Sequence, residues 1–203
     1  MTPEREASGW AGEACCRRPL LRLYNRIGNG LRRRGVRRDL AADDIRAAAE
    51  RHTGLKKQAS EYCDQALEVL IRSYEAQSRL HSWGRFLLRC ILVQLCKNRL
   101  LIDRYIANIP GVESEEISKP LFVLGLPRTG TTLLAGLLAQ DPAARPLMSW
   151  ETFWPVPQEK GVLKKKDRRR RDIRRLEWTL ARLLPGLRYV HPIRADRPEE
   201  CTW

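Results

Sequence analysis

The sequence predicts an α/β fold, a P-loop-type parallel sheet preceded by an all-helical N-terminal region. Apolar residues recur at helical spacing between residues 39 and 107. From residue 119 the pattern changes: the apolar run LFVL at 121–124 follows a proline and suits a buried strand of a parallel sheet. A glycine loop and an apolar helix come next. This order of strand, loop and helix is the unit on which phosphate sites are built.

Three parts are therefore expected: a basic, flexible arm at 1–38, a helical region at 39–115 and the α/β part at 119–203. The chain has 203 residues, with 38 Lys and Arg against 24 Asp and Glu, a net charge of +14. Its hydrophobic share of 43% is that of an ordinary globular protein, which excludes a wholly disordered chain. The charge favours polyanionic partners: nucleic acid, an anionic membrane or a phosphorylated small molecule.

The arm is expected to be poorly structured. From Arg17 to Arg38 there are nine arginines and no acid, and three glycines interrupt any helix. The arm either binds a polyanion or is a solvated basic tail, and the tail is the favoured interpretation. A second basic run, at 164–175, is expected to begin a helix with a solvated basic face.

The helical region is expected to supply a core rather than chemistry. Asp39 is predicted to cap a short helix through Glu50, Ser60 to offer an N-cap oxygen to a second helix, and Ser82 to begin a third. The apolar positions of the later two helices lie at i, i+3, i+4 and i+7 and predict buried faces.

No segment is apolar enough to cross a membrane. A span needs about 20 mostly apolar residues, and the best run, 86–96, is shorter and contains an arginine. The N-terminus carries acids and no apolar core, unlike a secretory signal. The six cysteines form no CxxC pair and no zinc-finger spacing, so a reducing, cytoplasmic location is expected.

The loop GLPRTGTT at 125–132 is the segment that carries chemistry. It fits GxxxxG followed by two threonines, whereas an ATP-binding loop has lysine directly after the second glycine. Thr131 stands at that position, which argues against a kinase or NTPase. The geometry of an anion site is kept, because the N–H groups of Gly130, Thr131 and Thr132 lie at the start of a helix predicted for 131–140.

The stretch PLFVLGLPRTGTTLL, with the downstream Asp141-Pro142 and Trp150-Glu151, resembles the PAPS-dependent sulfotransferases. PAPS is 3′-phosphoadenosine 5′-phosphosulfate, and the resemblance is greatest to a bacterial branch with a helical N-terminal region. The PRTGTT element matches the family's 5′-phosphosulfate-binding loop. The resemblance implies that Arg128 contacts the phosphosulfate oxygens and that the following residues supply backbone and hydroxyl donors. The implied cofactor-binding residues are Pro127, Arg128, Thr129, Gly130, Thr131 and Thr132.

The implied reaction moves a sulfuryl group from PAPS to a hydroxyl or amine of a small-molecule or glycan-type acceptor, with no metal required. Arg128 would neutralise charge on the leaving group. Glu151 is the first candidate base, because it follows Leu147-Met148, where the next strand should end, and because several family members have a glutamate base near this point. The alternative is that Glu151 only caps the next turn. His191 is the second candidate, since histidine is the base in the cytosolic members and titrates near neutral pH.

Trp150, Phe153 and Trp154 flank Glu151 and either line an acceptor pocket or pack as core. Family members that resemble this chain are longer, and their 3′-phosphate site lies on a later strand and helix. The chain is therefore expected to be an N-terminal part with an incomplete sheet and weak or no catalysis. The alternative function is a basic nucleic-acid or anionic-surface binding protein with a vestigial P-loop, nucleic acid being the less favoured partner. The sequence predicts no oligomeric state.

Overall fold

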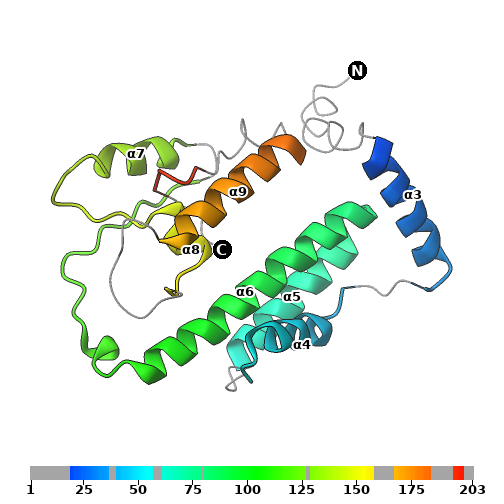
Figure 1. Cartoon of the computed structure of the whole chain (residues 1–203), viewed down its shortest axis with the longest axis horizontal. Coiled ribbons are helices and arrows are strands. Elements are labelled where there is room, and N and C mark those ends of the chain that lie inside the picture. The colour runs from blue at the N-terminus through cyan, green and yellow to red at the C-terminus, as the bar shows by residue number, and fades with distance from the viewer. Residues whose placement is uncertain are drawn as a thin grey trace. The chain divides into compact units, whose positions relative to one another are not determined.

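The structure is a computed structural model of the whole chain (Figure 1). It describes residues 19–36, 40–56, 61–78, 80–126, 129–157, 167–183 and 194–198. The chain divides into two compact units, Met1–Asn108 and Ile109–Trp203. The first unit ends where the last long helix ends, a few residues before the boundary expected at 115–119.

The first unit is helical. Its helices are α3 (Pro19–Arg33), α4 (Ala42–Thr53), α5 (Glu61–Gln77) and α6 (Ser82–Asn108). Helix α4 packs along α6, α3 packs against α6, and α5 packs against α4. The predicted helix start at Ser82 is confirmed, and α5 begins directly after Ser60, which lies outside the described residues. The buried core comprises Ile45, Ala48, Ile71, Leu92 and Val93.

Helix α4 starts and ends later than predicted. Its N-cap residue is Ala41, and Asp39 lies outside the described residues. The helix continues beyond Glu50 to Thr53 and ends at Gly54, whose φ of 68° lies in the left-handed region. The Gly54 N–H donates to the carbonyl of Glu50 at 2.8 Å. A glycine in this conformation is the usual helix stop, and it determines the end here.

The structure corrects the expectation that the arm at 1–38 is unstructured, because α3 occupies part of it. The glycine at 35 ends this helix instead of preventing it. Gly35 has a φ of 71°, its N–H donates to the Arg32 carbonyl at 2.9 Å, and the Val36 N–H donates to the Leu31 carbonyl at 3.0 Å. This pair of bonds is a Schellman motif.

Helix α3 contacts the start of α6 through its small and polar residues. The Ser82 hydroxyl donates to Asn29 Oδ1, and the Trp83 N–H donates to Asn25 Oδ1, both at 2.8 Å. Gly28 is buried, and the Tyr24 ring meets the Trp83 ring edge-on at 5.8 Å between centroids. These contacts fix which face of α3 lies against the unit.

Glu75 joins three segments of the first unit. Arg85 donates to both carboxylate oxygens of Glu75, with Nη2 to Oε2 at 2.7 Å, and the Leu40 N–H donates to Oε1 at 3.1 Å. The hydrogen bond from Arg85, with smaller contributions from the Leu40 N–H and the Arg85 and Arg32 charges, lowers the pKa of Glu75 against the opposing effect of burial. The ionised carboxylate is thus the form that stabilises the fold.

We expect Glu75→Gln to lower the free energy of unfolding at neutral pH by about 1–3 kcal/mol, because Arg85 loses an ionised partner. Since folding lowers the pKa of Glu75, its contribution is complete above the ordinary value of 4.5 and is lost as the pH falls through the folded value. The wild-type chain should therefore lose more stability on acidification than Glu75→Gln. Denaturant unfolding between about pH 3 and 7 measures this difference.

The control is Glu68→Gln, at a side chain that is 52% exposed. Equal acid sensitivity of the wild type and Glu75→Gln would contradict the prediction.

The second unit contains a short 3-10 helix, η1 (Val112–Ser114), and the helices α7 (Thr131–Leu138), α8 (Ser149–Phe153) and α9 (Arg168–Leu183). Helix α8 packs against α9 (Figure 1). Trp150, Ile173 and Ala195 form the buried cluster between them and residues 194–198. None of the helices in the described part of the chain is both long and apolar enough to span a bilayer.

The predicted parallel sheet is not present in the described part of the chain. Residues 121–126 belong to neither a helix nor a strand, and Leu121 and Phe122 are 73% and 76% exposed. Among the described residues the β contact is one antiparallel bridge, between Met148 and Pro198. A parallel strand exists only with a neighbour that pairs its N–H and C=O groups. An apolar run predicts burial, but it does not supply that neighbour.

Candidate functional site

The loop before α7 folds back on itself. The N–H and the hydroxyl of Thr129 both donate to the Leu126 carbonyl, at 3.3 and 2.6 Å. Gly130 follows as the N-cap of α7 with a φ of 93°, a conformation that side chains rarely adopt. The helix begins at Thr131, as predicted, and ends at Leu138, two residues early.

The first glycine of the loop is required by space. A Cβ at Gly125 would lie 2.7 Å from Thr131 Cγ2 and 2.8 Å from Thr129 Oγ1. Gly125 therefore lets the chain entering the loop approach the chain leaving it, while Gly130 supplies the positive φ. The two glycines of the GxxxxG pattern are therefore required for different reasons, space at Gly125 and backbone conformation at Gly130.

The N-terminus of α7 has the features of an anion site. Thr129, Gly130 and Thr132 are exposed, and the first turn of the helix carries no acidic residue. Backbone N–H groups at a helix start, together with the positive end of the helix dipole, favour phosphate and sulfate groups. Pro127, Arg128 and His191 lie outside the described residues, so the functions predicted for them stay predictions.

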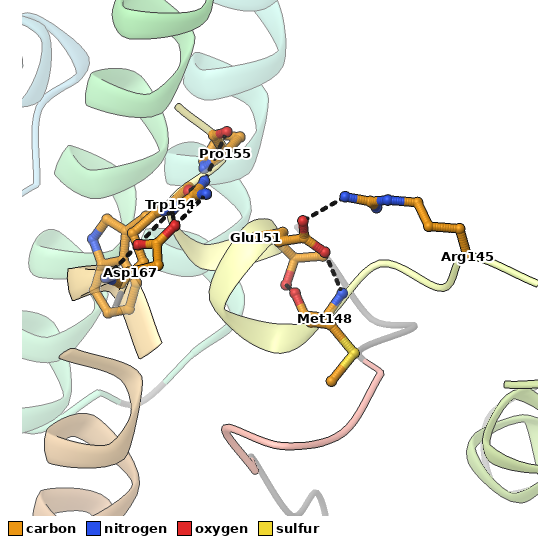
Figure 2. A network of polar contacts seen from close by, with 8 residues as sticks. Arg145, Met148, Glu151, Trp154, Pro155 and Asp167 are labelled. Carbon is orange, nitrogen blue, oxygen red and sulfur yellow. Dashed lines mark hydrogen bonds and ion pairs between the residues drawn. The ribbon is translucent and has the colours of Figure 1, made fainter. Parts of the chain in front are cut away.

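Glu151 lies in the first turn of α8, with both carboxylate oxygens engaged (Figure 2). Oε1 accepts a hydrogen bond from Arg145 Nη2 at 2.6 Å, and Oε2 accepts one from the Met148 N–H at 3.0 Å. The Glu151 side chain is 11% exposed, whereas that of Arg145 is 63% exposed. The contact with Met148 is the capping interaction that was the alternative to a catalytic function. It holds the carboxylate in one orientation, and the exposed Arg145 contacts its other oxygen.

Residues 194–198 pack against the start of α8. Ser149 is 1% exposed; its hydroxyl lies 2.7 Å from the Arg194 carbonyl and 3.0 Å from the Arg197 carbonyl. The Ser149 N–H donates to the Arg197 carbonyl at 3.1 Å. A segment far along the sequence is thereby held beside Glu151. Sequence reasoning missed Ser149, and no motif distinguishes a buried serine at that position.

Trp150 is a core residue. It is 3% exposed, and the guanidinium carbons of Arg169 and Arg170 lie 4.6 and 4.9 Å from its ring centroid. Phe153 and Trp154 are partly buried against the same cluster. Of the two interpretations of these aromatic residues, the structure agrees with packing in the core rather than with the wall of an acceptor pocket.

Arg169 departs from the solvated face predicted for the basic run, because it is 3% exposed. Its guanidinium donates to the Asp167 carboxylate at 2.8 Å and to the carbonyls of Trp154 and Pro155 at 2.8 and 3.1 Å, three residues labelled in Figure 2. The hydrogen bonds from Arg169 lower the pKa of Asp167 against the opposing effect of burial. Through these hydrogen bonds, Arg169 links the residues after α8 to the start of α9.

The comparisons with known proteins agree on one family. The model of the sulfotransferase family matches residues 120–203. Through this segment, the chain resembles the sulfotransferases. The matched residues contain the loop, α7, Glu151 and residues 194–198, so the matched segment includes every described part of the candidate site. No curated protein matches the chain.

Two solved sulfotransferases resemble the chain in structure. STF1 from Mycobacterium tuberculosis H37Rv has 29% sequence identity and a TM-score of 0.63, over 74% of this chain and 42% of that one. STF9 from Mycobacterium avium has 28% identity and a TM-score of 0.63, over 78% of this chain and 41% of that one. The chain thus spans about two fifths of the length of these sulfotransferases. Because the shared part exceeds residues 120–203, it takes in some of the helical region too.

Proposed function

We propose that the loop at 125–132 binds the 5′-phosphosulfate of PAPS, and that the chain is part of a PAPS-dependent sulfotransferase. The observation that carries the proposal is the exposed N-terminus of α7, which follows a double-glycine loop inside the segment that matches the family. The loop has no lysine after Gly130, and the threonines there offer hydroxyl and N–H donors. Such donors suit a phosphosulfate bound without the lysine of an ATP-binding loop.

PAPS would supply an activated sulfuryl group, with 3′,5′-ADP as the leaving product. The loop N–H groups and Arg128 would hold the phosphosulfate and neutralise the charge that develops on the departing phosphate. The acceptor, a hydroxyl or amine of a small molecule or glycan, would lose its proton to a base. Glu151 is the proposed base, because its carboxylate is oriented by the Met148 N–H and its other oxygen contacts an arginine that is itself exposed. His191 is the second candidate.

The parallel sheet is part of the same proposal. Leu121, Phe122 and Leu124 are 73%, 76% and 89% exposed. Neighbouring strands would bury this apolar surface and place the loop at the strand's carboxyl end, where ligands bind in open α/β sheets. Since the chain spans about two fifths of the solved sulfotransferases, turnover is itself a proposal, and ligand binding is the more direct test.

Equilibrium titration of the purified chain with PAPS, 3′,5′-ADP and Mg-ATP tests the proposal. At about 150 mM salt, which screens unspecific attraction, we expect PAPS and 3′,5′-ADP to compete for one site. Mg-ATP should compete at least about tenfold less well, because Thr131 stands where an ATP-binding loop has lysine. Equal binding of all three ligands would indicate general attraction to a basic chain. No binding by a folded chain would contradict a site formed by these residues.

A further inference from the structure

Helix α3 presents an apolar stripe to solvent. Leu20, Leu23, Ile27 and Leu31 recur at spacings of three and four residues, which places them on one face of the helix. They are 79%, 55%, 54% and 39% exposed. A surface helix normally buries such a stripe against its own domain. Here the stripe faces away from it.

The reason is that another face of α3 makes the contact with the first unit. Asn25 and Asn29 accept hydrogen bonds from the start of α6, and Gly28 between them is buried. These residues occupy a different side of the helix from the stripe. The apolar side of α3 is therefore directed away from the helical unit.

The charges around the stripe indicate what kind of partner it fits. Helix α3 contains four arginines and no acid, and from Arg17 to Arg38 the chain has nine arginines and no acid. Arg26, Arg33 and Arg34 are exposed. A second copy of the helix would bring arginines against arginines, and a nucleic acid would pair with the arginines but leave the leucines in water. An anionic lipid surface fits both features of α3, because its headgroups pair with the arginines and its acyl chains bury the apolar stripe.

We propose that α3 docks on anionic membrane surfaces, lying in the plane of the interface with Leu20, Leu23, Ile27 and Leu31 inserted below the headgroups. The exposed arginines bind lipid phosphates beside it, with their stems along the apolar boundary. At 15 residues α3 is about 22 Å long, too short to span a bilayer. This surface function is separate from the proposed transferase site, which lies in the second unit.

Vesicle flotation with the whole chain tests the proposal. The probes are vesicles of phosphatidylcholine alone and of roughly three parts phosphatidylcholine to one part phosphatidylglycerol, at about 150 mM salt. We expect binding to the anionic vesicles only. Leu23→Gln with Ile27→Gln removes the centre of the stripe, keeps the net charge and introduces a good helix former. It should lower the partition coefficient at least about tenfold.

The matched control is Tyr62→Gln with Val69→Gln. These residues are 83% and 62% exposed on α5, so the pair removes exposed apolar surface elsewhere in the same unit. It should leave vesicle binding unchanged, and circular dichroism confirms that both double variants keep their helices. The proposal is overturned if no vesicle binds or if the α3 and α5 variants behave alike. It is also overturned if sedimentation shows that the stripe is buried in a dimer, or if α3 binds duplex DNA and no vesicle.

Discussion

Arg169→Met is expected to lower the free energy of unfolding of the second unit by about 3 kcal/mol. The substitution keeps an unbranched apolar stem but removes every guanidinium donor. The Asp167 carboxylate and the carbonyls of Trp154 and Pro155 then lose partners at 2.8, 2.8 and 3.1 Å in a site where the arginine is 3% exposed. Buried acceptors left without donors account for most of the loss. Denaturant unfolding followed by tryptophan fluorescence measures it.

Arg170→Met is the matched control. Arg170 is exposed and also lies over the Trp150 ring, at 4.9 Å, so its loss removes the same charge and a similar ring contact without the buried hydrogen bonds. We expect a change below about 1 kcal/mol. Because the pKa of Asp167 is lowered in the folded chain, its contribution is present above the ordinary value of 3.8 and is lost as the pH falls through the folded value. Equal effects of the two arginine variants would show that the buried hydrogen bonds of Arg169 do not stabilise the second unit.

Arg128→Ala is expected to weaken binding of 3′,5′-ADP by about tenfold to hundredfold, the contribution of a charge-assisted hydrogen bond to an anion. Arg145→Ala is the control, because it removes the same charge from an exposed side chain outside the loop. Glu151→Gln should also leave the affinity unchanged, since a base acts on the acceptor and not on the nucleotide. If both arginine variants weaken binding equally, general electrostatics and not the loop holds the ligand.

The sequence predicted the features that depend on local residue order. The two glycines and the threonines that follow them placed the start of α7 at Thr131 correctly, because the positive φ of Gly130 prevents a right-handed helix from including that residue. The start of α6 at Ser82 was also predicted from neighbouring residues alone. Both predictions needed only the residues of one turn.

The features that the sequence could not determine depend on distant partners. Gly28 and Gly35 seemed to break any helix, but one is buried where α3 meets α6 and the other is the helix stop. The basic run gave no sign that Arg169 is the buried one among its described arginines, since two of its partners are carbonyls about fifteen residues earlier. The strand expected at 121–124 stays a prediction, because it needs a neighbour that the described part of the chain does not provide.

Amide hydrogen exchange with and without 3′,5′-ADP tests the central claim most directly, because it locates the ligand on the chain. The account predicts slower exchange at the amides of Gly130, Thr131 and Thr132, with α3 and α9 unchanged. Protection confined to the basic residues of α3 or α9 would show a polyanion-binding chain in place of a phosphosulfate loop. Unchanged exchange at the start of α7, under conditions where 3′,5′-ADP is bound, would contradict the proposed site.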